Sequence, residues 1–111
     1  DLASLIDDVR FKTDEIFKDK IYRYYLKLNK KRVNEATLLS DFEILSILRN
    51  MKIIGIFTRL AMRDKKKQYL KLIPYAWKLI ELRISNNTKF SDLKGLLDLN
   101  FSKKIRNQNE N

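Results

Sequence analysis

The chain has 111 residues, of which 44% are hydrophobic and 34% are charged, with only two glycines and one proline. This length suits one domain, and this composition favours packed helices over a strand-and-turn architecture or a disordered chain. The sequence contains no cysteine and no histidine. It therefore excludes thiolate nucleophiles, disulfides, imidazole acid/base chemistry and the usual zinc ligands.

The chain carries a formal net charge of +10, and a strong positive charge is typical of proteins that bind nucleic acid. Its Lys and Arg residues are, however, spread along the sequence and interrupted by 14 acidic residues. A coding bias towards Lys, Asn and Ile would give the same charge without such a partner, so we do not expect nucleic-acid binding. No apolar run approaches the roughly 20 residues of a membrane span, and no signal-peptide pattern opens the chain. We therefore expect a cytoplasmic protein with no membrane partner.

The spacing of apolar residues predicts an all-α fold of about five or six helices. The first pattern, DLASLIDDVR, is helical from Asp1 onwards, so we interpret the start of the chain as a cut end. Its apolar face consists of Leu2, Leu5, Ile6 and Val9. Thr13 is expected to cap a second helix. The buried stripe of that helix is expected to consist of Ile16, Phe17, Ile21, Tyr24, Tyr25 and Leu28.

A third helical segment is expected to be capped by Asn34, and nothing breaks its pattern over residues 35–63. A helix of this length would extend about 43 Å at the standard rise. It is longer than most globular helices, so a break near Arg49 and Asn50 stays open.

A proline marks the next boundary, because Pro74 disfavours helical geometry at the residue before it. The sequence therefore predicts a short helix over KQYLKLI and a new helix that starts near Pro74. SNNTKF is predicted to be a loop, and Ser91 is expected to cap a last short helix that ends at Leu97. Residues 1–98 then form one helical unit, and residues 99–111 form a polar, frayed tail.

One side of the long helix is basic. At 100° per residue a stripe of side chains falls within about 80° of arc, namely Arg49, Lys52, Ile56, Arg59 and Arg63. Gly55 lies beside this stripe and costs about 1 kcal/mol relative to alanine in a helix interior. We expect close approach of another helix or of a ligand to compensate for that cost, and we favour tight packing.

The arginines of this stripe have two possible roles. They pair with nearby acidic side chains such as Asp7, Asp8 or Asp64, or they recognise an anionic group through the guanidinium fork. The sequence contains no glycine-rich phosphate loop, no H-x-D catalytic loop and no D-x-D metal motif. Asp7 and Asp8 are adjacent and point about 100° apart on a helix, which is poor geometry for a shared acid/base pair. We expect the chain alone to be catalytically inert, with no metal ligands.

Two stretches resemble a known family. Residues 49–80, RNMKIIGIFTRLAMRDKKKQYLKLIPYAWKLI, resemble the C-terminal helical region of the aminoglycoside phosphotransferase-like kinases, in particular the bacterial branch acting on N-acetylmuramate and N-acetylglucosamine. DLASLIDDVR is similar to a segment that follows the family's metal-binding aspartate motif. At Lys65, where the family tends to carry glycine, the sequence departs from the pattern, so a tight turn is less well specified there. The matching positions in the longer stretch are Arg49, Asn50, Lys52, Gly55, Ile56, Phe57, Arg59, Leu60, Arg63, Asp64, Lys66, Tyr69, Leu70, Pro74 and Trp77.

This resemblance implies that the chain is the helical C-terminal part of the C-lobe of a protein-kinase-like α+β fold. Residues 1–98 would be the helical subdomain of a phosphotransferase and residues 99–111 its polar tail. The parent enzyme would transfer the γ-phosphoryl group of ATP to a sugar hydroxyl, with magnesium, by positioning and charge stabilisation. Its nucleotide-binding lobe, catalytic aspartate and metal ligands would lie upstream. The sugar acceptor and ATP would then be partners of the parent, while this chain holds no cofactor and supplies the acceptor-side wall.

The resemblance also suggests roles for particular residues. Arg59 and Arg63 are candidates for facing the acceptor or for tying the long helix to the first one. Trp77 and Tyr69 could stack on a sugar ring, although a Trp at helical spacing from Ile73 and Ile80 is more typical of a core residue. Asp1 would brace the catalytic loop from the start of a buried helix.

Two other classes of function stay open. One is a free-standing basic helical module that binds nucleic acid through the stripe and through residues 65–67. The other is a helical protein-interaction domain without chemistry.

Overall fold

The computed structural model describes residues 2–29, 34–85 and 87–108, and all regular structure in these ranges is helical. The α-helices are α1 (Leu2–Ile6), α2 (Glu15–Leu28), α3 (Glu35–Arg63), α4 (Ile73–Ser85), α5 (Ser91–Asn100) and α6 (Lys103–Arg106). Two short 3-10 helices, η1 (Lys67–Leu72) and η2 (Thr88–Phe90), connect them. The described residues contain no strand, which confirms the all-α prediction for the chain.

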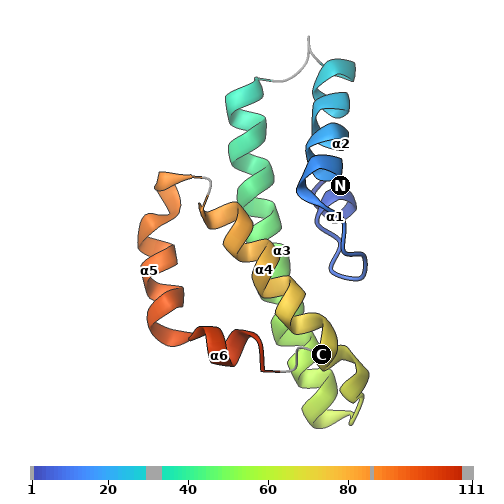
Figure 1. The fold of residues 1–111 in the computed structure, drawn as a ribbon, viewed down its shortest axis with the longest axis vertical. Helices are drawn as coiled ribbons and strands as arrows, with labels where there is room; N and C mark the ends of the chain where they lie inside the picture. Colours follow the sequence, from blue (N-terminus) through green and yellow to red (C-terminus); the bar gives the residue numbers. More distant parts are fainter. Residues whose placement is uncertain (1, 30–33, 86, 109–111) are drawn as a thin grey trace.

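The helices are organised around α3 and α4, which make the most extensive contact in the fold. Figure 1 shows α4 crossing in front of α3, with α1 and α2 on one side of this pair and α5 and α6 on the other. None of the helices within the described ranges is both long and apolar enough to cross a lipid bilayer.

The long helix forms as the sequence predicts. The Asn34 side chain accepts a hydrogen bond from the Thr37 N–H at 3.1 Å, and α3 then continues without a break for 29 residues. The chain turns back after Asp64 because Lys65 adopts a left-handed conformation, with φ of 56°. This turn brings the Lys66 N–H to the Leu60 carbonyl at 3.0 Å. The tight turn is therefore present, although a lysine stands at the position that glycine would adopt at no steric cost.

Lys65→Gly is expected to raise the free energy of unfolding by up to about 1 kcal/mol, because it removes the Cβ penalty of the left-handed turn. Urea denaturation of the two proteins measures this difference. Lys66→Gly is the matched control, since Lys66 has φ of −90° and glycine there only adds unfolded-state entropy. A loss of stability in Lys65→Gly equal to that in the control would contradict the expectation.

The main core lies between α3, α4 and α5. It consists of Ile47, Ile73, Trp77, Ile80, Ile84 and Leu97. Pro74 is the second residue of α4, where its missing N–H is not needed by the helix. A short helix followed by a new helix near Pro74 agrees with the prediction, but the boundary lies one residue earlier than expected. Ile73 is the first residue of α4 and has helical dihedral angles although it precedes a proline.

The second helix differs from its prediction in cap and in buried face. Asp14, not Thr13, caps α2, since its carboxylate accepts a hydrogen bond from the Phe17 N–H at 2.7 Å. The buried side chain of α2 is Lys18, and the expected apolar stripe is mostly exposed. Ion pairing explains the difference, because the buried carboxylate of Asp7 holds the Lys18 ammonium and turns that face of α2 inwards.

The C-terminal part also departs from expectation. Ser91 is the first residue of α5 and not its cap, since Phe90 occupies the N-cap position without a side-chain hydrogen bond, and the helix continues past Leu97 to Asn100. The tail is not simply frayed, because α6 folds back against α4 through Arg106, whose side chain is 6% exposed. SNNTKF contains η2 in place of a plain loop.

Candidate functional site

A buried carboxylate joins the N-terminal segment to the helical wall. Asp7 follows directly after α1 and is 0% exposed. Arg83 of α4 binds it in a bidentate manner, with Nε 2.7 Å from Oδ2 and Nη2 2.8 Å from Oδ1. The same guanidinium lies 4.6 Å from the centroid of the Phe42 ring. Asp7 therefore ties the end of α1 to α4, two helices that are far apart in sequence.

Further donors complete this cluster. Lys18 Nζ lies 3.2 Å from Asp7 Oδ1 and 2.5 Å from the Ile6 carbonyl oxygen. The Ser46 hydroxyl donates a short hydrogen bond to Asp7 Oδ2, and Asn50 Nδ2 donates to the Ser46 carbonyl at 2.9 Å. We call Asp7, Lys18, Ser46, Asn50 and Arg83 the Asp7 cluster. It contains residues from α2, α3 and α4 around one carboxylate.

The electrostatics of the Asp7 cluster favour the ionised carboxylate. Burial raises the pKa of Asp7, but the hydrogen bonds and charge of Arg83, together with Ser46 and Lys18, outweigh it, so the pKa lies below its usual value. A buried, ionised carboxylate saturated with donors is not suited to exchange protons with a substrate. The Asp7 cluster is therefore an anchor for helices and not an acid/base group.

The neighbouring aspartate serves a different contact. Asp8 accepts hydrogen bonds from the Arg10 backbone N–H at 2.9 Å and from its guanidinium at 2.9 and 3.1 Å. These hydrogen bonds, with a smaller contribution from the charge of Arg49, hold the pKa of Asp8 below its usual value. The helix expected over DLASLIDDVR ends at Ile6, so Asp7 and Asp8 are not separated by helical geometry as predicted. They still serve different contacts, since Asp7 is buried in the Asp7 cluster and Asp8 pairs with Arg10 near the surface.

These contacts bring the two resembling stretches together. Asp7 and Asp8 belong to DLASLIDDVR, whereas Arg49 and Asn50 open the second stretch. Asp8 lies within electrostatic reach of Arg49, and Asp7 reaches Asn50 through Ser46. Segments separated by about 40 residues therefore form one structural unit at the N-terminal half of α3.

A hollow of about 460 Å³ opens beside the Asp7 cluster between α2, α3 and α4. Glu43 lines it and is buried, with Asn87 Nδ2 3.3 Å from its carboxylate. The Tyr22 hydroxyl, also in the lining, has no hydrogen-bond partner among the described residues. Burial, reinforced by Glu35 and Glu43, raises the pKa of Tyr22. Within the described ranges, no group of three or more acidic side chains is arranged to hold a metal ion.

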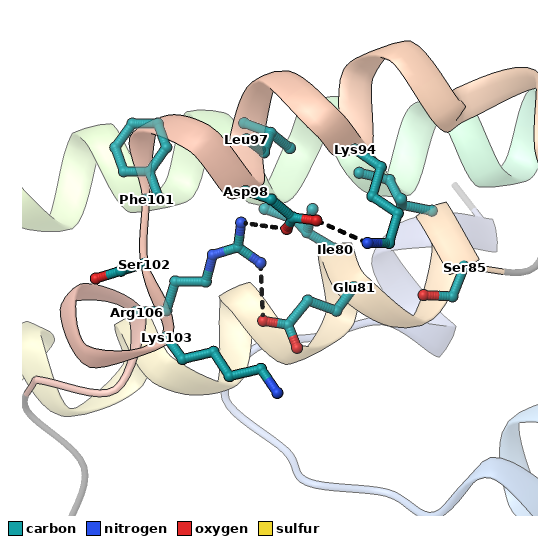
Figure 2. A pocket seen from close by; sticks show the side chains of 11 residues that line it. Ile80, Glu81, Ser85, Lys94, Leu97, Asp98, Phe101, Ser102, Lys103 and Arg106 are labelled. Carbon is teal, nitrogen blue, oxygen red and sulfur yellow. Dashed lines mark hydrogen bonds and ion pairs between the residues drawn. The ribbon is translucent and has the colours of Figure 1, made fainter.

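A second hollow of about 340 Å³ lies between α4, α5 and α6. Figure 2 shows Arg106 at its centre, with its guanidinium directed to Asp98 and Glu81 at 3.0 and 3.1 Å. The same guanidinium covers the Trp77 ring, 4.8 Å from its centroid, and Phe101 packs against that ring at 5.0 Å. The charges of this hollow are thus largely paired with one another.

The residues expected to face the acceptor lie in different surroundings. Trp77 is 5% exposed and belongs to the main core, the second of the two roles considered for it. Tyr69 packs on Phe57, with ring centroids 5.0 Å apart. Arg63 is exposed and pairs with Asp64 at 3.3 Å, as one alternative proposed. Asp1 lies outside the described residues.

The basic stripe is exposed, but the glycine beside it is not packed. Arg49, Lys52, Arg59 and Arg63 all face solvent on α3. Neither Arg59 nor Arg63 bonds to α1 within the part of the chain that the structure describes. A Cβ added at Gly55 would meet nothing within 4 Å. The expected tight packing at Gly55 is therefore absent from the described fold, because α4 covers the opposite face of α3.

Sequence reasoning missed the partners of Asp7. Arg83 and Lys18 read as ordinary solvent-facing cations, since Arg83 comes two residues after Glu81 and Lys18 directly before Asp19. A weak signal was present: Lys18 lies on the same helical face as Ile21 and Tyr22, which pack on the small core of Ala3, Ile6 and Phe42.

Comparison with known proteins gives one informative similarity. The chain is 28% identical over 79 residues to an N-acetylmuramate/N-acetylglucosamine kinase of Pseudomonas aeruginosa. The match covers 68% of this chain and 23% of that protein, so the chain spans less than a quarter of the length of this relative. No family model matches the chain. No solved structure matches it significantly. The similarity supports a link to a kinase family over the part of the chain that it covers.

Proposed function

We propose that this chain is the C-terminal helical portion of an ATP-dependent phosphotransferase that acts on an amino sugar, and that it forms the acceptor-side wall. The similarity to the sugar kinase supports the class of enzyme. The observation that carries the proposal is the meeting of the two kinase-like stretches at Asp7 and Asp8, next to Arg49 and Asn50. Two sequence matches that meet in space support one shared architecture for both stretches.

The chemistry of this proposal divides between two parts of the parent. ATP with magnesium would supply the γ-phosphoryl group, held by a nucleotide-binding part outside this chain. The residues described here would hold the acceptor in position, and positioning is, with charge stabilisation, a main source of catalysis in phosphoryl transfer. The Asp7 cluster would keep the segment after the metal-binding motif rigid against α3 and α4. Asp1 would brace the catalytic loop.

The direct test is the longer reading frame. We expect the sequence upstream of Asp1 to encode a glycine-rich loop and an H-x-D-x-x-x-x-N segment, and the longer protein to consume ATP with N-acetylmuramate or N-acetylglucosamine. The 111-residue chain is the control and is expected to be inactive. An intact gene product that starts at this aspartate, or a longer protein without either motif, would refute the proposal.

Arg63 is an acceptor-side candidate with an accessible guanidinium, since it is exposed and its partner Asp64 is the adjacent residue. In the longer protein, Arg63→Ala is expected to raise the KM for the sugar about tenfold with little change in kcat, because it removes a charged hydrogen bond made equally in ground and transition states. Steady-state kinetics with varied sugar measure the effect. Lys89→Ala, an exposed cation of η2, is the matched control. Equal kinetics in the two variants would remove Arg63 from the acceptor site.

The exposed basic stripe supports one alternative, a nucleic-acid-binding module. Such binding would lose affinity steeply as ionic strength rises, because it depends on counterion release. A salt titration of the 111-residue chain with duplex DNA distinguishes the two functions. Absence of binding near 50 mM salt excludes the alternative.

A further inference from the structure

We infer that the solvent-facing side of α3 is a helix-docking seam, occupied by an acidic helix of the nucleotide-binding part of the same polypeptide; this rests on the proposed function. The seam consists of Leu45, Leu48, Lys52, Gly55, Arg59 and Met62. These residues are spaced 3-4-3-4-3, which is the pattern that packs one helix against another along a single line. No other described element covers this seam.

The ends of the seam are apolar and exposed. Leu45, Leu48 and Met62 are 52%, 56% and 79% exposed. The opposite side of α3 carries the buried residues, including Ile47, and is covered by α4. Large apolar side chains repeated at seam positions on a well-formed helix mark an interaction surface more than scattered exposed leucines do.

The centre of the seam is suited to close approach. Gly55 is exposed, has open space where a Cβ would lie, and stands near the middle of a 29-residue helix. A glycine there weakens the helix, and none of the described residues makes a compensating contact with it. A helix that crosses at Gly55 would approach the α3 backbone more closely than any side chain permits, which supplies the missing compensation.

The charge of the seam defines the occupant. Lys52 and Arg59 flank Gly55, and neither forms an ion pair with any residue in the described ranges. An occupying helix therefore needs carboxylates opposite these two positions. A second copy of this chain does not meet this requirement, because antiparallel seams would place Lys52 and Arg59 of one copy against the same cations of the other. More than three quarters of the relative lies outside the matched region, which is ample for such a helix in a protein of that length.

The experiment compares one substitution in two proteins, the 111-residue chain and the longer protein. In the chain alone, Gly55→Leu is expected to leave the melting temperature unchanged or raise it by up to about 4 °C, because the site is open and leucine is the better helix former. In the longer protein the same substitution is expected to lower the melting temperature by about 5 °C, because the side chain would clash with the docked helix.

Gly95→Leu is the matched control, since Gly95 is an exposed helical glycine on α5 with equally open space. It is expected to behave alike in both proteins. Lys52→Glu with Arg59→Glu tests the charge of the occupant, and is expected to destabilise the longer protein far more at low salt than at high salt.

The outcomes separate the inference from the proposed function. A longer protein that phosphorylates the sugar yet tolerates Gly55→Leu as well as the control would overturn the docking seam and leave the function standing. A longer protein that Gly55→Leu destabilises but that transfers no phosphoryl group would retain the seam and refute the function. A reading frame with nothing upstream refutes both. Dimers of the 111-residue chain that Gly55→Leu dissociates would also overturn the inference, since a second copy would then be the occupant.

Discussion

Asp7→Asn is expected to destabilise the folded chain by about 3–5 kcal/mol, more than any surface substitution. Asparagine keeps the shape of aspartate but removes the charge that neutralises Arg83 and Lys18, whose side chains are 12% and 5% exposed. Removing one partner of a buried ion pair leaves the other charge desolvated and unpaired, and this cost exceeds the net benefit of forming the pair. For a small domain such a loss is a large part of the total stability.

Urea denaturation followed by circular dichroism measures this effect. Asp8→Asn is the matched control, because the adjacent carboxylate is only partly buried and pairs with the exposed Arg10. If Asp7→Asn does not fold, Asp7→Leu combined with Arg83→Met provides the second arm, since it removes two of the three buried charges. It is expected to be less destabilised than Asp7→Leu alone, which leaves both Arg83 and Lys18 unpaired. Equal stability of Asp7→Asn and Asp8→Asn would show that the Asp7 cluster does not anchor the helices.

The same carboxylate gives the fold a defined dependence on pH. The pKa of Asp7 is lowered in the folded state, so its stabilisation is fully present above the unfolded pKa of roughly 3.9 and is lost as pH falls through the lower folded value. Denaturation midpoints measured between about pH 6 and pH 2 should therefore fall for the natural chain below about pH 4. The Asp7→Leu and Arg83→Met double variant should show a smaller fall. Identical pH profiles of the denaturation midpoint in the two proteins would show that Asp7 is not the source of the pH dependence.

Trp77→Ala is expected to cost about 3–5 kcal/mol in the 111-residue chain, because it opens a cavity at the centre of the main core. The indole contacts Phe101 and the guanidinium of Arg106, so its loss also loosens α6. Arg106 would keep its pairs with Glu81 and Asp98 but lose the surface that covers it. The stability of the chain, measured without any sugar, is thus the informative quantity.

Two variants make this test specific. Trp77→Phe keeps an aromatic side chain of smaller volume and is expected to recover more than half of the lost stability. Leu99→Ala is the control for removal of an apolar side chain, since Leu99 is 84% exposed and should cost less than about 0.5 kcal/mol. Trp77→Ala with the stability of the natural chain would instead leave the ring free for the acceptor role expected from the resemblance.

Local patterns in the sequence determined most of the helices. The Asn34 cap, the unbroken periodicity of α3 and the proline at the start of α4 each act within a few residues, so sequence spacing alone predicted these boundaries. The basic stripe followed from the same periodicity, since 100° per residue places Arg49, Lys52, Arg59 and Arg63 on one side whatever else the chain does. The resemblance to a kinase family likewise depended on order and spacing.

Only the tertiary structure decided which polar groups are buried and which apolar groups remain exposed. Asp7, Lys18 and Arg83 come from three parts of the sequence, and apart from the helical face that Lys18 shares with Ile21 and Tyr22, no local pattern shows that they leave solvent. Their burial follows from charge pairing across helices, which has no period in the sequence. Gly55 and the seam of α3 show the opposite difference, since they remain exposed although the sequence predicts that they are packed. Their spacing predicts a packed helix face, yet packing needs a partner element, and no described residue of this chain supplies one.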